Sequence, residues 1–65
     1  MRVIVNDTEH RIDELTTVAA LLERLGFPDR GVAVAVNRAV LPRSEWGSVV
    51  PEGATIDVLT AVQGG

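Results

Sequence analysis

The spacing of apolar residues changes to that of a helix over residues 18–25, and this change limits the folds that the chain can adopt. Four apolar side chains there recur at the i, i+3, i+4, i+7 spacing of a single helical face. They are Val18, Leu21, Leu22 and Leu25. Thr16 or Thr17 can cap the start of this helix, Gly26 can end it, and Pro28 prevents it from resuming. We therefore expect one amphipathic helix, with its leucine face in a core.

The other apolar residues occur in short runs rich in Val and Ile, which predict β-strands. Asn6 and Asp7 tolerate positive φ, so they are expected to turn the first two strands into a hairpin. The run from Val32 to Asn37 is apolar on both faces, which predicts a central strand or one whose outer face is covered. The expected strands are Arg2–Asn6, Thr8–Ile12, Val32–Asn37, Ala39–Leu41 as a short edge strand, and Thr55–Val62.

One helix can cover one face of a sheet, so this element order predicts an α+β fold. We expect a single domain over residues 1–65, with a mixed sheet of four to five strands packed on one main helix. If the first and last strands lie side by side in the centre, the arrangement is a β-grasp. Pro42 suits the start of a helical turn, Trp46 is expected to be a packing anchor, and Pro51-Glu52-Gly53 predicts a turn.

Composition removes several classes of function. The chain contains no cysteine, which excludes disulfides, thiolate metal sites and cysteine nucleophiles. Its single histidine, His10, has no second histidine at ligand spacing, so we expect no metal site. A net charge of −3 without a basic patch argues against nucleic acid as a partner. No catalytic set of side chains can be argued, and 65 residues leave little room for an enclosed active site.

The sequence has no pattern of a signal peptide or a membrane span. Its longest apolar run, Val32–Val36, is far shorter than the roughly 20 residues that a spanning helix needs. We therefore expect a cytoplasmic location and no membrane partner.

The sequence ends in Gly64-Gly65, which directs attention to the carboxylate of Gly65. A carboxylate is a poor electrophile and must be activated, most simply as a mixed anhydride with AMP. A tail without Cβ atoms can pass through a narrow channel and adopt backbone angles closed to other residues. Such a chain supplies the electrophile, and a partner supplies the catalysis.

The order and spacing of several motifs resemble those of the ThiS family, the sulfur carriers of thiamine biosynthesis. The resemblance covers nearly the whole chain and includes a Val-Asn-Asp at the first turn. It departs at Ala54-Thr55, where an acidic residue is expected after Gly53, and this puts a local turn contact in doubt. The motifs are Thr17-Val18 with Leu21-Leu22, Val34-Ala35-Val36-Asn37, Pro42-Arg43 with Trp46, Glu52-Gly53, Ile56 and Gly64-Gly65.

The resemblance implies a ubiquitin-like β-grasp fold and a mechanism. A ThiF-like or MoeB-like adenylating enzyme would use ATP and Mg²⁺, neither bound by this chain, to make the acyl-adenylate of Gly65. Sulfur derived from a cysteine desulfurase, or from an enzyme persulfide, would then displace AMP and leave a thiocarboxylate. Thiazole synthase would take that sulfur to build the thiazole ring. The chain itself is then a carrier and co-substrate, and the cofactors belong to its partner.

The last strand also offers a candidate partner-binding patch. If Ile56 and Val58 face the helix, then Leu59 and Ala61 face outward, and with Val62 they form an apolar surface beside the tail of Gln63, Gly64 and Gly65. Leu59 could equally be a scattered exposed apolar residue, which is common on protein surfaces.

Other interpretations of the glycine tail stay open. The chain could be a β-grasp sulfur carrier for molybdopterin or cysteine synthesis, because such carriers share the Gly-Gly end. It could be a ubiquitin-like modifier that is conjugated to lysines of other proteins. It could also be an interaction module whose tail is inert.

Overall fold

The computed structural model describes residues 1–61 of the chain. The predicted helix and all five predicted strands are present, with small shifts at their ends. Residue 62, with which the last strand was expected to end, lies outside the described residues. The elements are β1 (Arg2–Val5), β2 (Thr8–Arg11), α1 (Val18–Arg24), β3 (Val32–Val36), β4 (Ala39–Leu41), the 3₁₀ helix η1 (Arg43–Glu45) and β5 (Thr55–Thr60).

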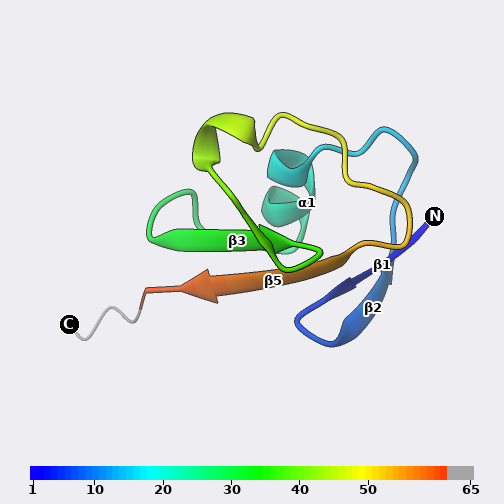
Figure 1. Cartoon of the computed structure of the whole chain (residues 1–65), viewed down its shortest axis with the longest axis horizontal. Helices are drawn as coiled ribbons and strands as arrows, with labels where there is room; N and C mark the ends of the chain where they lie inside the picture. The colour runs from blue at the N-terminus through cyan, green and yellow to red at the C-terminus, as the bar shows by residue number, and fades with distance from the viewer. Residues whose placement is uncertain (62–65) are drawn as a thin grey trace.

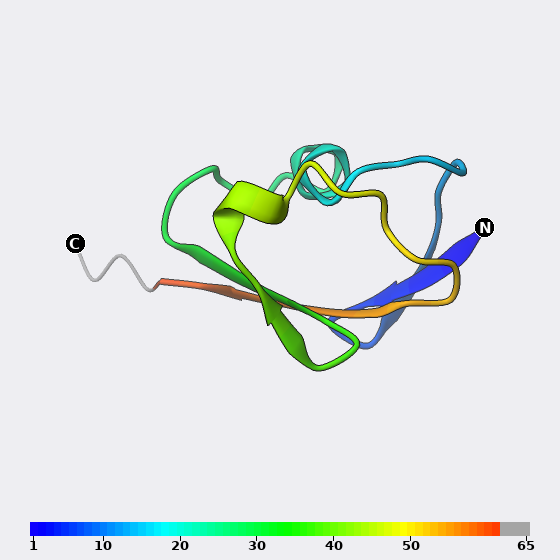
Figure 2. The same cartoon turned by 45° about the horizontal axis from the view of Figure 1, so that its top comes forward.

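The five strands form a single mixed sheet in the order β2-β1-β5-β3-β4. The first and last strands pair in parallel, while the other neighbours pair antiparallel. Helix α1 lies across one face of this sheet, and β5 runs through its centre toward the carboxyl end of the chain (Figures 1 and 2). This topology confirms the predicted β-grasp fold. Strand β3 was predicted to be either central or covered on its outer face. It lies inside the sheet, and Ala33 on its outer face is exposed, so the first alternative is confirmed.

Two hairpin turns use residues with positive φ, as the twist of antiparallel strands requires. Asn6 and Asp7 have φ values of 48° and 69° between β1 and β2. Asn37 and Arg38 have φ values of 51° and 72° between β3 and β4. The predicted Asn6-Asp7 turn is therefore confirmed, and a second turn of the same kind connects β3 to β4.

The ends of α1 are fixed by local side-chain and backbone contacts. The hydroxyl of Thr17 accepts a hydrogen bond from the N–H of Ala20 at 3.1 Å, so Thr17 is the capping residue. The hydroxyl of Thr16 donates instead to the carbonyl of Asp13. Gly26 has a φ of 84° and donates to the carbonyl of Glu23 at 3.0 Å, which closes the helix as predicted.

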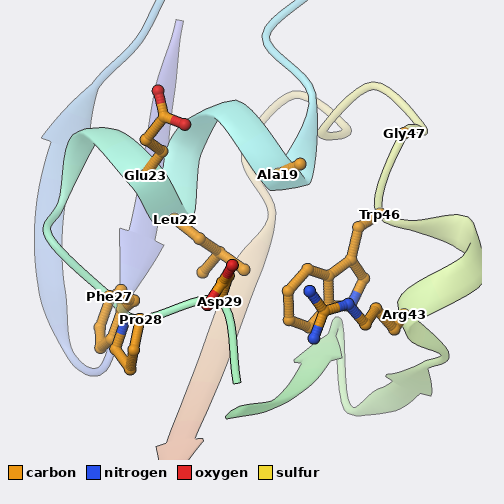
Figure 3. Close-up of a pocket in the computed structure, with 9 residues that line it drawn as sticks. All are labelled: Ala19, Leu22, Glu23, Phe27, Pro28, Asp29, Arg43, Trp46 and Gly47. Atoms are coloured by element: carbon orange, nitrogen blue, oxygen red, sulfur yellow. The ribbon is translucent and has the colours of Figure 1, made fainter. Parts of the chain in front are cut away.

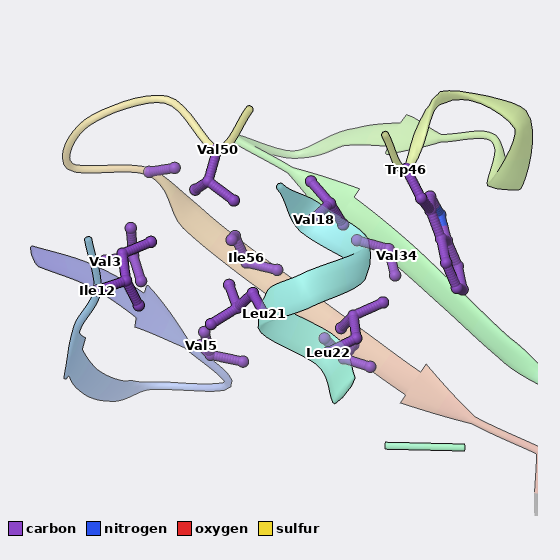
Figure 4. Close-up of a cluster of buried hydrophobic side chains, with 12 residues drawn as sticks. Val3, Val5, Ile12, Val18, Leu21, Leu22, Val34, Trp46, Val50 and Ile56 are labelled. Carbon is purple, nitrogen blue, oxygen red and sulfur yellow. The ribbon is translucent and has the colours of Figure 1, made fainter. Parts of the chain in front are cut away.

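Twelve buried side chains form the core between α1 and the sheet (Figure 4). The helix contributes Val18, Leu21 and Leu22, with Leu25 partly buried against them, which confirms the predicted core face. Val3 and Val5 come from β1 and Ile56 and Val58 from β5, so the two central strands supply the floor of the core. The remaining members are Ile12, Val34, Trp46, Val50 and Ala54.

The segment between β4 and β5 closes one side of the core. Trp46 is 8% exposed, and its indole N–H donates to the carbonyl of Leu41 at 3.3 Å, so it is the packing anchor that the sequence predicted. Beyond it, the N–H of Ala54 donates to the carbonyl of Pro51 at 3.1 Å. This backbone bond closes the predicted turn at the position where an acidic residue was expected, and Ala54 itself is buried.

Candidate functional site

The candidate site is built around the carboxyl end of β5. On this strand Ile56 and Val58 point into the core, whereas Leu59 is 72% exposed and Ala61 is exposed. The orientation predicted from the alternation of side chains is therefore confirmed. The N–H of Ala61 donates to the carbonyl of Gly31, which holds the end of this segment against the start of β3.

The tail residues fall outside the described part of the chain. Val62, Gln63, Gly64 and Gly65 come directly after Ala61, and the structure gives no geometry for them. What the structure does fix is the point from which they depart, at the end of the central strand.

Leu59 belongs to a larger apolar patch on the sheet face that α1 leaves uncovered. The register places Ala33 opposite Leu59 and Ala35 opposite Val40, and Val40 is 79% exposed. We call Ala33, Ala35, Val40 and Leu59 the open-face patch. These side chains line a shallow hollow bordered by Asp57. A set of apolar residues that gather from three strands is more than a single exposed leucine, and it is typical of a contact surface.

Sequence reasoning found Leu59 but missed the other members of the open-face patch. The signal was present in the run of β3, where Ala33 and Ala35 alternate with inward valines. The exposure of Val40 depends on its register with Ala35 across a hairpin, which the sequence alone did not specify.

A separate cavity of about 370 Å³ lies on the helix side of the sheet (Figure 3). Phe27 and Pro28 lie on one side of it and Trp46 on the other, with the guanidinium carbon of Arg43 5.4 Å from the centre of the indole ring. A cation over an aromatic face helps to hold the ring in place. The cavity is the space between α1 and the segment that carries the packing anchor.

The described residues offer no enclosed catalytic centre. No polar or charged residue among residues 1–61 is buried. Within the same range, no group of three or more His, Cys, Asp or Glu side chains lies close enough to hold a metal ion, and His10 is only half-buried. In the part of the chain that the structure describes, no helix is long and apolar enough to cross a membrane.

Fold and surface together define a ubiquitin-like β-grasp domain with an exposed apolar patch next to the carboxyl end of its central strand. The profile of the ThiS family matches residues 1–65, which is the whole chain. The chain therefore belongs to the ThiS family.

Individual relatives agree with this assignment. The chain is similar to the sulfur carrier protein ThiS of Escherichia coli, with 32% identity over 66 residues that cover all of both chains. It is also similar to the crystal structure of the thiamine biosynthesis protein ThiS from Geobacter metallireducens, with a TM-score of 0.76 and 28% identity over all of both chains. The solution structure of a thiamine biosynthesis protein from the same organism gives a TM-score of 0.77 at 28% identity, covering all of this chain and 88% of that one.

Two longer proteins contain a similar segment. The thiazole synthases of Paramagnetospirillum magneticum and Magnetococcus marinus are 33% and 38% identical to this chain over 66 residues. The match covers all of this chain but 20% of each synthase, so the chain spans about a fifth of the length of these relatives.

Proposed function

We propose that this chain is a sulfur carrier of thiamine biosynthesis that carries sulfur as a thiocarboxylate on Gly65. The observation that supports this most directly is the match to the ThiS family over the full chain, together with a sulfur carrier relative of the same length. The fold adds a physical reason, because β5, the strand that precedes the tail in the sequence, carries Leu59 of the exposed apolar patch.

In the first step the Gly65 carboxylate attacks the α-phosphorus of ATP. A carboxylate oxygen forms a bond to phosphorus, pyrophosphate leaves, and the product is an acyl-adenylate. A ThiF-like or MoeB-like adenylating enzyme supplies the site, with Mg²⁺ to neutralise the phosphate charge. In this proposal the chain is a co-substrate, in line with its membership of the ThiS family and its similarity to a sulfur carrier protein. Because activation uses ATP, we assign the reaction to the cytoplasm.

In the second step sulfur replaces AMP at the acyl carbon. A persulfide sulfur that originates from a cysteine desulfurase attacks the carbon, and AMP leaves with the electron pair of the carbon–oxygen bond. A second thiol then attacks the enzyme-side sulfur of the resulting acyl disulfide, so that a disulfide forms between the two enzyme sulfurs and the thiocarboxylate leaves. The chain contains no cysteine, so it offers no thiol of its own for this exchange.

Thiazole synthase is the proposed acceptor of the sulfur. Two thiazole synthases each contain a segment similar to this whole chain, which supports a functional link between the carrier and that enzyme. A carrier and an acceptor that are joined in one polypeptide meet at a high effective concentration.

The open-face patch is the proposed docking surface for the adenylating enzyme. Leu59 and Ala61 were predicted for this role together with Val62, which lies outside the described residues. We add Val40 and the two alanines of β3 to the proposal, because they lie next to Leu59 on the same face. An apolar surface beside the tail lets docking and tail insertion occur in one encounter.

Intact-mass spectrometry tests the proposal. The chain with a free Gly65 carboxylate is incubated with adenylating enzyme, ATP, Mg²⁺, cysteine desulfurase and cysteine. We expect a mass increase equal to the difference between sulfur and oxygen, and release of pyrophosphate. The matched control lacks only Gly65, keeps all described elements and should gain no sulfur. If the full chain stays unmodified while a known carrier is converted by the same enzymes, the proposal is wrong.

A further inference from the structure

Two asparagines at the hairpin turns hold β5 through their side chains. Asn37 lies beside the start of the strand, where its Oδ1 accepts a hydrogen bond from the N–H of Thr55 at 3.0 Å. Asn6 makes a two-way contact further along: its Oδ1 accepts from the N–H of Val58 at 2.8 Å, and its Nδ2 donates to the carbonyl of Val58 at 3.1 Å. The Asn6 amide thus pairs with Val58 as the backbone of a neighbouring strand would.

The Asn6 contact lies where β1 stops supporting β5. Parallel pairing between these strands covers Thr55 and Ile56, and the N–H of Asn6 donates to the carbonyl of Ile56 at 3.0 Å. The chain then turns away at Asp7, whereas β3 continues to pair with β5 as far as Thr60. Among the described residues, the Asn6 side chain therefore extends the pairing of β5 on its β1 side from Ile56 to Val58, two residues further.

The Asn6 contact lies directly before the part of β5 that reaches the docking surface and the tail. Leu59, the β5 member of the open-face patch, comes immediately after Val58, and Ala61 is the last described residue. Past Val58, backbone pairing from β3 and Gly31 is what holds this strand end among the described residues. Without the Asn6 amide, the part of β5 beyond Ile56 would be paired only on its β3 side.

We propose that Asn6 is a positioning residue for the activation of the tail. Its amide fixes the backbone at Val58, so that Leu59 on the docking surface and the departure point at Ala61 keep a fixed separation and direction. A binding partner then meets an ordered strand end and does not have to order it, which strengthens binding. This inference rests on the proposed function, because the position of the strand end matters only if an enzyme must receive the tail.

Glycine substitutions separate this role from the role of Asn6 in its turn. Glycine adopts positive φ freely, so Asn6→Gly keeps the hairpin turn and removes the amide. Asn37→Gly is the matched control, because it also keeps a positive-φ turn and removes a hydrogen bond to β5, but at the end remote from the tail.

The test measures ATP–pyrophosphate exchange by the adenylating enzyme at varied carrier concentration. For Asn6→Gly we expect the KM for the carrier to rise about tenfold, the equivalent of one or two net hydrogen bonds. The kcat at saturating carrier should stay within about twofold, because the acyl group and the enzyme are unchanged. Asn37→Gly should leave both constants near the wild-type values. In parallel, amide hydrogen exchange should accelerate at Val58 in Asn6→Gly and at Thr55 in Asn37→Gly.

The following outcomes would contradict the positioning role of Asn6. A wild-type KM in Asn6→Gly with faster exchange at Val58 overturns the role of Asn6 and leaves the proposed function intact. An equal rise of KM in both variants also overturns it, because the cause is then general loss of stability. If the wild-type chain supports no exchange at all, the proposed function is wrong and the role of Asn6 fails with it.

A second variant covers the case in which Asn6→Gly does not fold. Asn6→Asp tolerates the same turn and keeps an acceptor for the Val58 N–H, but it loses the donor and places a carboxylate oxygen against the Val58 carbonyl. Its KM is expected to be higher than that of the wild type, because one of the two hydrogen bonds to Val58 is lost. A KM equal to that of the wild type contradicts the proposal.

Discussion

The two faces of the sheet differ in how far their apolar side chains are buried. The face toward α1 buries Val3, Val34, Ile56 and their neighbours almost completely. The opposite face leaves Leu59 and Val40 more than 70% exposed, at 72% and 79%. Both faces belong to the same five strands, so the difference comes from which residue of each alternating pair points each way.

Under the proposed function, this difference separates stability from recognition within one small sheet. Burial of apolar area on the covered face supplies the main stabilisation of the fold. The exposed apolar residues add little to the fold, but they are in place to lose water when a partner docks. A substitution should therefore change the free energy of unfolding on one face and the interaction with an enzyme on the other.

The largest effect is expected from Leu21→Ala on the covered face. Leu21 is 0% exposed, and its truncation leaves a cavity between the helix and β5. Core leucine truncations cost about 2–5 kcal/mol, and a domain of this size has a total stability of only about 5 kcal/mol. We expect most or all of the cooperative urea transition to be lost. A Leu21→Ala chain that unfolds at the same urea concentration as the wild type would contradict the claim that the covered face stabilises the fold.

The next largest effect is expected from Leu59→Ala on the open face. Truncation of an interface leucine should raise the KM for the carrier in ATP–pyrophosphate exchange by about 5- to 20-fold. The midpoint of urea unfolding should stay within error of the wild type, because Leu59 is exposed. Ile4→Ala is the matched control: Ile4 is also on the open face, at 40% exposure, but beside the start of β5. Equal KM increases for both variants would show that docking is not confined to the patch.

A smaller effect is expected from Thr17→Ala at the start of α1. Loss of its hydrogen bond to the Ala20 N–H should lower the free energy of unfolding by about 1 kcal/mol. Thr16→Ala is the neighbouring control and should cost less, because the Thr16 hydroxyl bonds a loop carbonyl and does not cap the helix. Urea unfolding of both variants measures the difference, and the reverse order would contradict the assignment of the cap.

The smallest effect is expected from Glu9→Gln on the open face. Glu9 pairs with Arg2 at 3.3 Å, but the two side chains are 56% and 66% exposed. Exposed pairs contribute about 0–1 kcal/mol, and salt reduces the contribution further. We expect a thermal midpoint within about 2 °C of the wild type, with the difference vanishing at high salt. A larger loss would show that the open face also contributes to folding.

Much of the fold could be predicted from the sequence because local signals were strong. The leucine spacing identified the helix and its buried face, and Asn6-Asp7 identified the first turn. The central pairing of the first and last strands did not follow from residue periodicity; the resemblance to the ThiS family implied it, and the structure confirms it.

The remaining features depend on contacts between distant parts of the chain. Asn6 was assigned to a turn, but its amide also pairs with Val58, which lies 52 residues further along the chain. Val40 joined the patch only through its register with Ala35. Such features require strand register in three dimensions, and a local pattern of residues does not carry it. The roles of Gly64 and Gly65 stay predictions, since these residues lie outside the described part of the chain.

The adjacency of β1 and β5 has a consequence for incomplete copies of the protein. These two adjacent strands come from residues 2–5 and 55–60, at opposite ends of the described chain. Because β5 lies between the β1–β2 hairpin and the β3–β4 hairpin, the sheet stays incomplete until β5 is inserted. A polypeptide interrupted before Thr55 lacks the centre of the sheet and half of the floor under the helix. Such a fragment also lacks Leu59 and the strand that pairs with Ala33 of β3, so we expect it neither to complete the sheet nor to present the open-face patch.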